Sequence, residues 1–182
     1  MTNALTQMTE LLVLRPHSPG VRTRATTRHA ILAIDTPAPV ACVDITNLVE
    51  SAVDRTGLVC GTVNIQTRHT TTGVMINEHE PLLLSDLEAM FERLAPRTST
   101  YLHDDFARRA ALEPDERRNG HAHCRAALLR ASECVNVVGA RLALGRWQRV
   151  FLVELDGPRR REISLLLAGR RSDRRVSATT RP

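Results

Sequence analysis

Alternating apolar and polar residues predict that strands dominate the chain. In residues 58–69, Val59, Val63 and Ile65 share one face and Cys60 and Thr62 lie on the other. This pattern predicts a strand that ends at His69. Further strands are predicted over residues 23–35, 74–76, 134–138, 148–156 and 161–168.

Helical spacing of apolar residues predicts three helices. They span residues 44–56, 81–94 and 121–131. Gly57 suits the end of the first helix, and the second begins at a proline and stops before Pro96. Because helices are inserted between strand pairs instead of alternating strictly with strands, the pattern favours an α+β fold of mostly antiparallel strands.

Length and composition predict one domain with two appendages. The chain has 182 residues, of which 42% are hydrophobic, enough for one ordinary core. Proline and glycine interrupt residues 15–20, so residues 1–20 are expected to be a partly disordered N-terminal extension. Residues 21–169 are expected to form a single domain. Residues 170–182 are expected to be a basic, disordered tail.

The charge pattern restricts the possible functions. All 25 basic residues are arginine, so Schiff-base lysines, P-loop lysines and lysine general bases are excluded. The net charge is +5, but residues 170–182 contribute +4 and the rest is nearly neutral. Aromatic residues make up only 3% of the chain, which argues against base-stacking surfaces. We therefore do not expect nucleic-acid binding, except through the tail.

The cysteines and the apolar runs indicate the compartment. The four cysteines are Cys42, Cys60, Cys124 and Cys134, and no two of them form a C-x-x-C pair. We interpret them as reduced thiols and expect a cytoplasmic protein. The longest apolar runs are too short to cross a bilayer, so no membrane association is expected.

The segment that follows the strand at residues 58–69 could bind an anion. His69 is followed by Thr70, Thr71, Thr72 and Gly73, which concentrate a ring nitrogen, hydroxyls and backbone N–H groups in a small volume. That combination suits phosphate. The alternative is a turn in which the threonines satisfy local backbone groups.

A second histidine-rich segment indicates metal chemistry. Asn119 and Gly120 precede His121 and His123, and imidazoles suit Zn, Ni or Mn. On a helix the two rings would diverge by roughly 200°, so only one could serve a given site. His69 or the His103–Asp104 pair could supply further ligands. The alternative is an ordinary surface pair.

A third candidate segment lies in the last predicted strand pair. Glu154 falls within an apolar strand, so it is either partnered, catalytic, or on the wet face of an edge strand. Asp156 opens an Asp-Gly-Pro turn, and Arg159 follows it. An arginine there could hold phosphate, although the arginines at 159–161 could also be a solvated rim.

The order of these motifs resembles the YjbQ-like family of small proteins, often described as secondary thiamine-phosphate synthases. The motifs are His69-Thr-Thr-Thr-Gly, Ile76-Asn-Glu, Tyr101-Leu-His-Asp, Asn119-Gly-His-Ala-His, Leu142-Ala-Leu-Gly-Arg-Trp147-Gln148 and Glu154-Leu-Asp-Gly-Pro-Arg159. The resemblance covers about residues 21–169. It implies a β-sandwich-like core and a homotrimer with a histidine-lined pocket near a subunit boundary.

The resemblance also implies the roles of individual residues. His69, His103 and His123 would coordinate a divalent metal (Zn, Mn, Ni or Mg), and together with Glu154 they would form the catalytic set. A small phosphorylated substrate would be held by the remaining motif residues, which are Thr70, Thr71, Asn119, Gly120, Trp147, Gln148 and Arg159. The expected reaction joins a pyrimidine pyrophosphate to a thiazole phosphate. Two alternatives stay open: a metal-dependent hydrolase or lyase, and a metal- or anion-binding protein without turnover.

Overall fold

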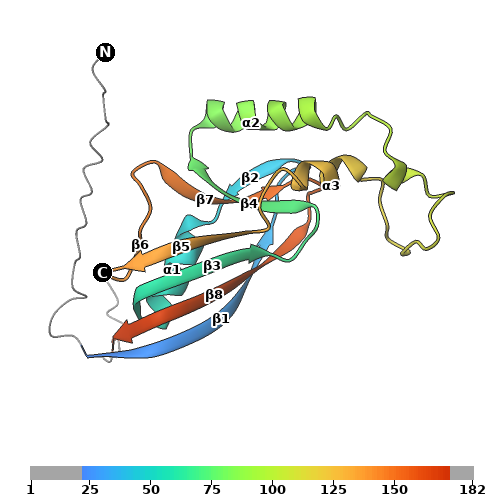
Figure 1. Ribbon diagram of the computed structural model, residues 1–182. Coiled ribbons are helices and arrows are strands. Elements are labelled where there is room, and N and C mark those ends of the chain that lie inside the picture. Colours follow the sequence, from blue (N-terminus) through green and yellow to red (C-terminus); the bar gives the residue numbers. More distant parts are fainter. Residues whose placement is uncertain (1–21, 173–182) are drawn as a thin grey trace, which may run out of the picture.

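The computed structural model describes residues 22–172, which form two antiparallel sheets with helices packed on and between them (Figure 1). The strands are β1 (Thr23–Asp35), β2 (Ala41–Asp44), β3 (Leu58–Thr67), β4 (Thr72–Glu78), β5 (Ser132–Val138), β6 (Arg141–Leu142), β7 (Gln148–Glu154) and β8 (Arg160–Ser172). The helices are α1 (Thr46–Thr56), α2 (Pro81–Leu94), α3 (Gly120–Ala126) and the short 3₁₀ helix η1 (Leu102–Asp104). The predicted α+β class is confirmed.

The two sheets divide the strands unequally. One sheet has five strands in the order β1-β8-β3-β5-β6, and the other has three in the order β2-β7-β4. Each pairing is antiparallel, and β1 and β8 pair along their whole length from Thr23–Ser172 to Asp35–Arg160. β1 is therefore an edge strand, and β7 is the centre of the smaller sheet.

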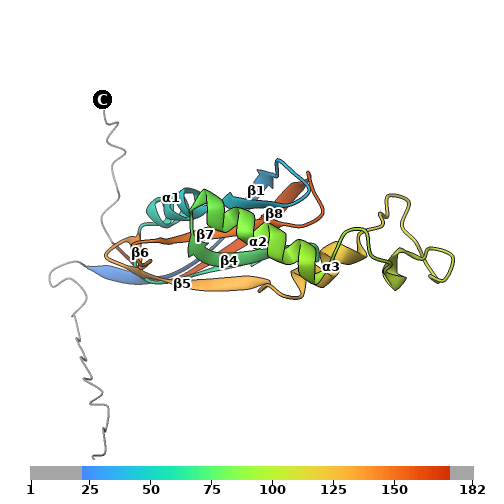
Figure 2. The ribbon, with the colours of Figure 1, turned by 90° about the horizontal axis from the view of Figure 1, so that it is seen from above.

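Strand β7 contributes to two apolar cores because successive side chains point to opposite faces. Val150 and Leu152 face the five-stranded sheet, and Phe151 and Val153 face α2 and α3; all four are fully buried. Viewed from above, α2 lies over β4 and β7 (Figure 2). The layers are thus α2, the three-stranded sheet and the five-stranded sheet.

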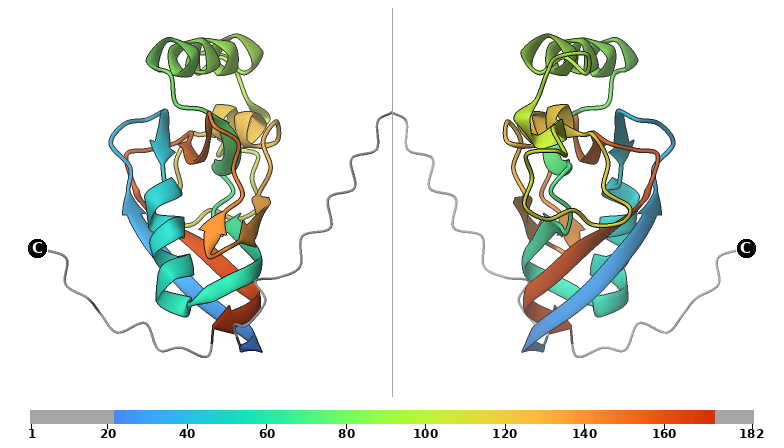
Figure 3. Two further views of the ribbon diagram at one scale, coloured as in Figure 1. Left: turned by 90° about the vertical axis from the view of Figure 1, so that its left-hand side faces the viewer. Right: turned by 90° about the vertical axis from the view of Figure 1, so that its right-hand side faces the viewer.

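Helix α1 fills the space beside the five-stranded sheet (Figure 3). Its Val49 and Val53 are buried in the core between the sheets. The carboxylate of Asp44 accepts a hydrogen bond from the Thr46 N–H at 2.9 Å at the start of the helix. Gly57 ends it in the left-handed conformation with φ 66°, as the sequence predicts.

Several predicted boundaries are wrong. β3 ends at Thr67, so His69 lies beyond the strand, and α3 ends at Ala126 and not at residue 131. The short strands β2 and β6 lack a clear alternation and were not predicted. β8 extends to Ser172 by pairing with β1, so the predicted tail boundary at residue 170 falls inside a strand. The remaining residues, 1–21 and 173–182, lie outside the described part of the chain.

Candidate functional site

A buried ion pair connects the two sheets. Glu154 on β7 shares the face of Leu152, and Arg161 on β8 shares that of Ile163, so both side chains enter the space between the sheets. Nε and a terminal nitrogen of Arg161 donate to the two Glu154 oxygens at 2.6 and 2.5 Å. The Glu154 side chain is fully buried, and that of Arg161 is 4% exposed.

Further donors complete the environment of Glu154. The Thr36 hydroxyl donates to Oε2 at 2.9 Å, and the backbone N–H groups of Leu155 and Asp156 donate to Oε1 at 3.0 and 2.8 Å. Burial acts to raise the Glu154 pKa, but the hydrogen bonds, led by those of Arg161, bring it below its ordinary value. Glu154 is therefore a partnered carboxylate. The interpretation that Glu154 lies on the wet face of an edge strand is wrong. β7 is the central strand of its sheet, and the Glu154 side chain is fully buried.

The histidine–threonine segment surrounds this ion pair. A terminal nitrogen of Arg161 donates to the Thr71 hydroxyl at 3.1 Å, while Thr70 is exposed. Nε2 of His69 accepts the backbone N–H of Glu162 at 2.8 Å. Burial, and next the charge of Arg161, lower the His69 pKa. His69 is thus a neutral ring with its proton on Nδ1.

A second group of polar side chains comes from η1, α3 and the β7–β8 turn, and we call it the histidine cluster. Its members are His103, Asn119, His123, Asp156 and Arg159. Asn119 Oδ1 lies 3.2 Å from Nε2 of His103, and Asn119 Nδ2 donates to Asp156 Oδ2 at 2.8 Å. Asp156 also pairs with a terminal nitrogen of Arg159 at 2.9 Å. The rings of His103 and His123 meet edge to face, with centroids 4.7 Å apart.

These contacts determine the tautomer of His103. Because Asp156 can only accept, it orients the Asn119 amide so that Oδ1 faces the imidazole. Nε2 of His103 must then carry a proton and donate it to Asn119 Oδ1. Burial, and next the neighbouring His103, lower the pKa of His123, so at neutral pH His123 is an uncharged base.

Close packing at Gly120 brings the two histidines together. A Cβ at this position would lie 2.4 Å from Cβ of Tyr101, so only glycine permits the approach of α3 to η1. The Gly120 N–H donates to Asp104 Oδ1 at 2.9 Å. Gly120 and Asp104 thereby hold the start of α3 against η1, and the histidines on these two elements meet.

The β7–β8 turn couples the histidine cluster to the ion pair. The backbone N–H of Arg159 donates to the Thr36 hydroxyl at 2.9 Å, and that hydroxyl also touches Glu154. Nε of Arg159 is buried and has no hydrogen-bond partner in residues 22–172. A buried guanidinium N–H without an acceptor is costly unless a ligand supplies one.

Two predicted substrate residues lie far from the cluster. Gln148 is the first residue of β7, Trp147 precedes it, and Glu154 is the last residue of the strand. Gln148 and Glu154 are therefore about 20 Å apart along β7. Their contacts are local: Arg146 stacks on Trp147, and Gly145 donates to Gln148 Oε1 at 2.7 Å. The structure does not bring these side chains to the histidines of the same chain.

His121 points away from His123, as expected for residues two apart on a helix. It is 5% exposed and lies near Tyr101, with ring centroids 6.4 Å apart. A cavity of about 490 Å³ opens beside these rings and is also lined by Asp104, Arg97 and Arg118. A polar cavity with two arginines therefore lies on the His121 side of α3, and none of the five residues of the histidine cluster lines it.

The predicted three-histidine metal set does not assemble within one chain. Among residues 22–172 no group of three or more His, Cys, Asp or Glu side chains is arranged to hold a metal ion. Nε2 of His69 is occupied by the Glu162 N–H, and only His103 and His123 touch. A divalent metal stays a prediction.

Sequence reasoning missed three important residues. Arg161 was assigned to a solvated rim, although its alternation with Ile163 along β8 indicates an inward side chain. The Asp-Gly-Pro pattern indicates only a turn at Asp156, and no sequence signal singles out Thr36. The contacts that reveal them join residues more than 30 positions apart, or depend on which sheet a strand faces.

Fold and site define an α+β protein of two antiparallel sheets with a histidine cluster where η1, α3 and the β7–β8 turn meet. Residues 30–170 match the family described as UPF0047 protein YjbQ-like. The chain belongs to this family.

Relatives support this assignment in sequence and in structure. A UPF0047 protein of Methanothermobacter thermautotrophicus is 37% identical over 76% of this chain and 90% of its own. One from Archaeoglobus fulgidus is 40% identical over 72% of this chain and 94% of its own. The crystal structure of a YbjQ-like protein of unknown function from Sulfolobus solfataricus superimposes with a TM-score of 0.71 at 31% identity, covering 80% of this chain and 99% of that one.

No described helix is long and apolar enough to cross a membrane.

Proposed function

We propose that the histidine cluster binds the phosphate of a small phosphorylated substrate and acts on it by acid–base catalysis. The observation that carries this proposal is the buried, unpartnered Nε of Arg159. Asp156 and Asn119 connect this arginine to His103, whose ring meets that of His123. Asp156 holds one side of the guanidinium and leaves Nε for an anion. Planar guanidinium groups suit phosphate oxygens particularly well.

The two histidines supply the proton-transfer groups. His103 carries a proton on Nε2, and its ring is held through Asn119 by Asp156. His123 has a lowered pKa and is therefore ready to accept a proton at neutral pH. A positioned acid–base pair of this kind contributes roughly 10²- to 10⁴-fold to a rate.

The most specific reaction within this proposal is the joining of a pyrimidine pyrophosphate to a thiazole phosphate, with release of pyrophosphate. The resemblance of the motifs supports it. A hydrolase or lyase on another small phosphorylated molecule would use the same groups.

Replacing Arg159 with glutamine is expected to weaken binding of inorganic phosphate about tenfold, because one charged donor pair is lost. Titration calorimetry at low ionic strength measures this change. Arg160→Gln is the matched control, since Arg160 is exposed and, within residues 22–172, pairs only with Asp35 at 3.5 Å. Equal phosphate affinity in wild type and Arg159→Gln would contradict the anion site.

The metal prediction is tested separately by elemental analysis of untagged protein purified without a metal column. If a metal is bound, we expect near-stoichiometric content in the wild type and its loss in His123→Ala. His69→Ala should retain the metal, because Nε2 of His69 already accepts a hydrogen bond. Loss in both variants would mean that His69 also belongs to the site and turns away from Glu162.

A homotrimer is part of the proposal, because a subunit boundary could complete the site. Large apolar side chains are exposed on α2, with Leu82 at 75% and Leu94 at 60%, and Trp147 is 61% exposed. Such surfaces are typical of interfaces. A neighbouring subunit could bring Trp147 to the histidine cluster. Sedimentation equilibrium measures the subunit number, and a monomer at micromolar concentration would overturn this point.

A further inference from the structure

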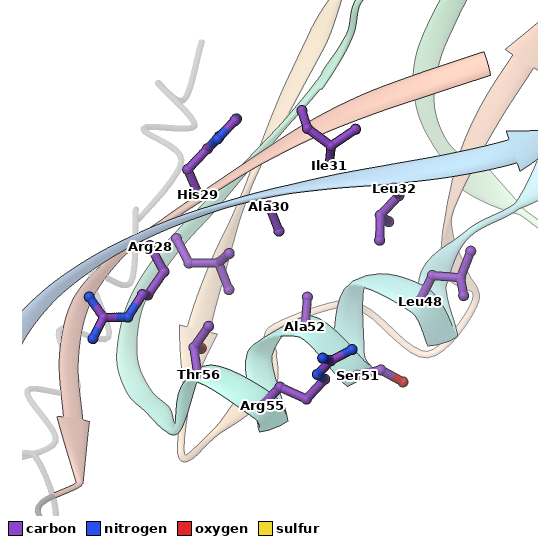
Figure 4. Close-up of a pocket in the computed structure, with 11 residues that line it drawn as sticks. Arg28, His29, Ala30, Ile31, Leu32, Leu48, Ser51, Ala52, Arg55 and Thr56 are labelled. Atoms are coloured by element: carbon purple, nitrogen blue, oxygen red, sulfur yellow. The ribbon is translucent and has the colours of Figure 1, made fainter.

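A groove lies between the edge strand β1 and helix α1, and none of its lining residues belongs to the histidine cluster or the ion pair. It has a volume of about 410 Å³, in the range of small-molecule sites. The lining residues are Arg28, His29, Ala30, Ile31, Leu32, Leu48, Ser51, Ala52, Arg55, Thr56 and Leu167 (Figure 4).

The floor of the groove is apolar. Ala30 and Leu32 of β1 point toward α1, and Ala52 points back toward them (Figure 4). Leu167 of β8 is fully buried beneath, and Leu48 at the helical rim remains 45% exposed. Part of the apolar face of α1 stays uncovered, because β1 is the last strand of its sheet.

The charge at the rim has one sign. Arg28 and Arg55 line the groove, and neither forms an ion pair within residues 22–172. A terminal nitrogen of Arg28 donates to the Thr27 carbonyl at 3.2 Å. The acids of α1, Glu50 and Asp54, line a different depression on the other side of the helix. Helix α1 therefore places Arg55 at the groove and its two acids, Glu50 and Asp54, at the other depression.

We propose that this groove binds an amphiphilic carboxylate, with an alkyl body on the apolar floor and the carboxylate at the arginines. Figure 4 shows Arg28 toward one end and Leu32 and Leu48 toward the other, with Arg55 on the helix between them. An elongated anion can thus place its two parts on matching surfaces.

Methyl NMR of the full chain with octanoate as the probe tests this site. We expect saturable shifts of the Leu32, Leu48 and Leu167 methyl signals. Replacing both Arg28 and Arg55 with glutamine should weaken octanoate binding about tenfold. The matched control is Arg93→Gln, because Arg93 is also an exposed helical arginine near a C-terminus but lies on α2.

Two further probes test the alkyl body and the carboxylate of the ligand separately. Acetate lacks the alkyl body and octylamine reverses the charge, so neither should shift these signals at the concentration at which octanoate saturates. Ala52→Leu fills the floor and should abolish octanoate binding while the rest of the spectrum is retained. Unsaturable shifts, equal binding of octylamine, or unchanged affinity in the double arginine variant would overturn the proposal.

Discussion

Arg161→Met is expected to lower the free energy of unfolding by about 3–5 kcal/mol, the cost of removing one partner of a buried ion pair. Glu154 is fully buried, and Arg161 supplies two of the five hydrogen bonds on its oxygens. Without the guanidinium, an uncompensated carboxylate remains between the sheets. Urea unfolding measures the loss. Arg160→Met, the matched control at an exposed pair, should change stability by less than about 0.5 kcal/mol.

The pH dependence identifies the cause of this loss. In the wild type the folded-state pKa of Glu154 is lowered, so its stabilising contribution is present above the unfolded pKa and is lost as pH falls through the folded one. In Arg161→Met the guanidinium no longer lowers the Glu154 pKa, and burial is opposed only by the hydrogen bonds from Thr36, Leu155 and Asp156, so the pKa rises above its wild-type value. The variant therefore recovers part of its deficit as pH falls and Glu154 takes up a proton.

A double substitution separates charge from packing. Glu154→Gln combined with Arg161→Met removes both charges and should cost less than Arg161→Met alone. The ion-pair explanation would fail if the stability loss in Arg161→Met were the same at every pH and no smaller in the double variant. The loss would then come from packing contacts of the Arg161 side chain.

His123→Ala is expected to lower kcat by about 10²- to 10⁴-fold with the pyrimidine pyrophosphate and thiazole phosphate pair, because the neutral imidazole next to His103 is lost. Release of pyrophosphate measures turnover. His29→Ala is the control, since His29 is exposed on β1, far along the chain from the histidine cluster, and its Nε2 lies 2.9 Å from the Ser164 hydroxyl.

The pH profile of the wild type gives a second measure of His123. Its pKa is lowered, so the base is unprotonated above that value and is lost as pH falls through it. The rate should reach its plateau below the pH at which an ordinary histidine would. Phosphate binding without turnover of any phosphorylated substrate would contradict the enzyme proposal and indicate a non-catalytic binder.

Local elements were predictable because their signals lie in neighbouring residues. The bounds of α2 and the start of β7 agree with the sequence pattern, since a proline, a helical repeat or a change in polarity marks them. The meeting of His103 and His123 was predicted only through the family resemblance. The spacing between residues 103 and 123 does not indicate that their side chains meet. The close contact between Gly120 and Tyr101 brings α3 against η1 and so brings the two histidines together.

The sequence by itself determined the α+β class, the main strands and helices and the candidate residues, because hydrophobic periodicity is a property of short segments. The tertiary structure alone decided what those residues do. Glu154 could have been wet, partnered or catalytic, and the pairing of its strand between β2 and β4 placed it opposite Arg161. Roles that depend on sheet order and on contacts distant in the chain are decided only when the strands pack.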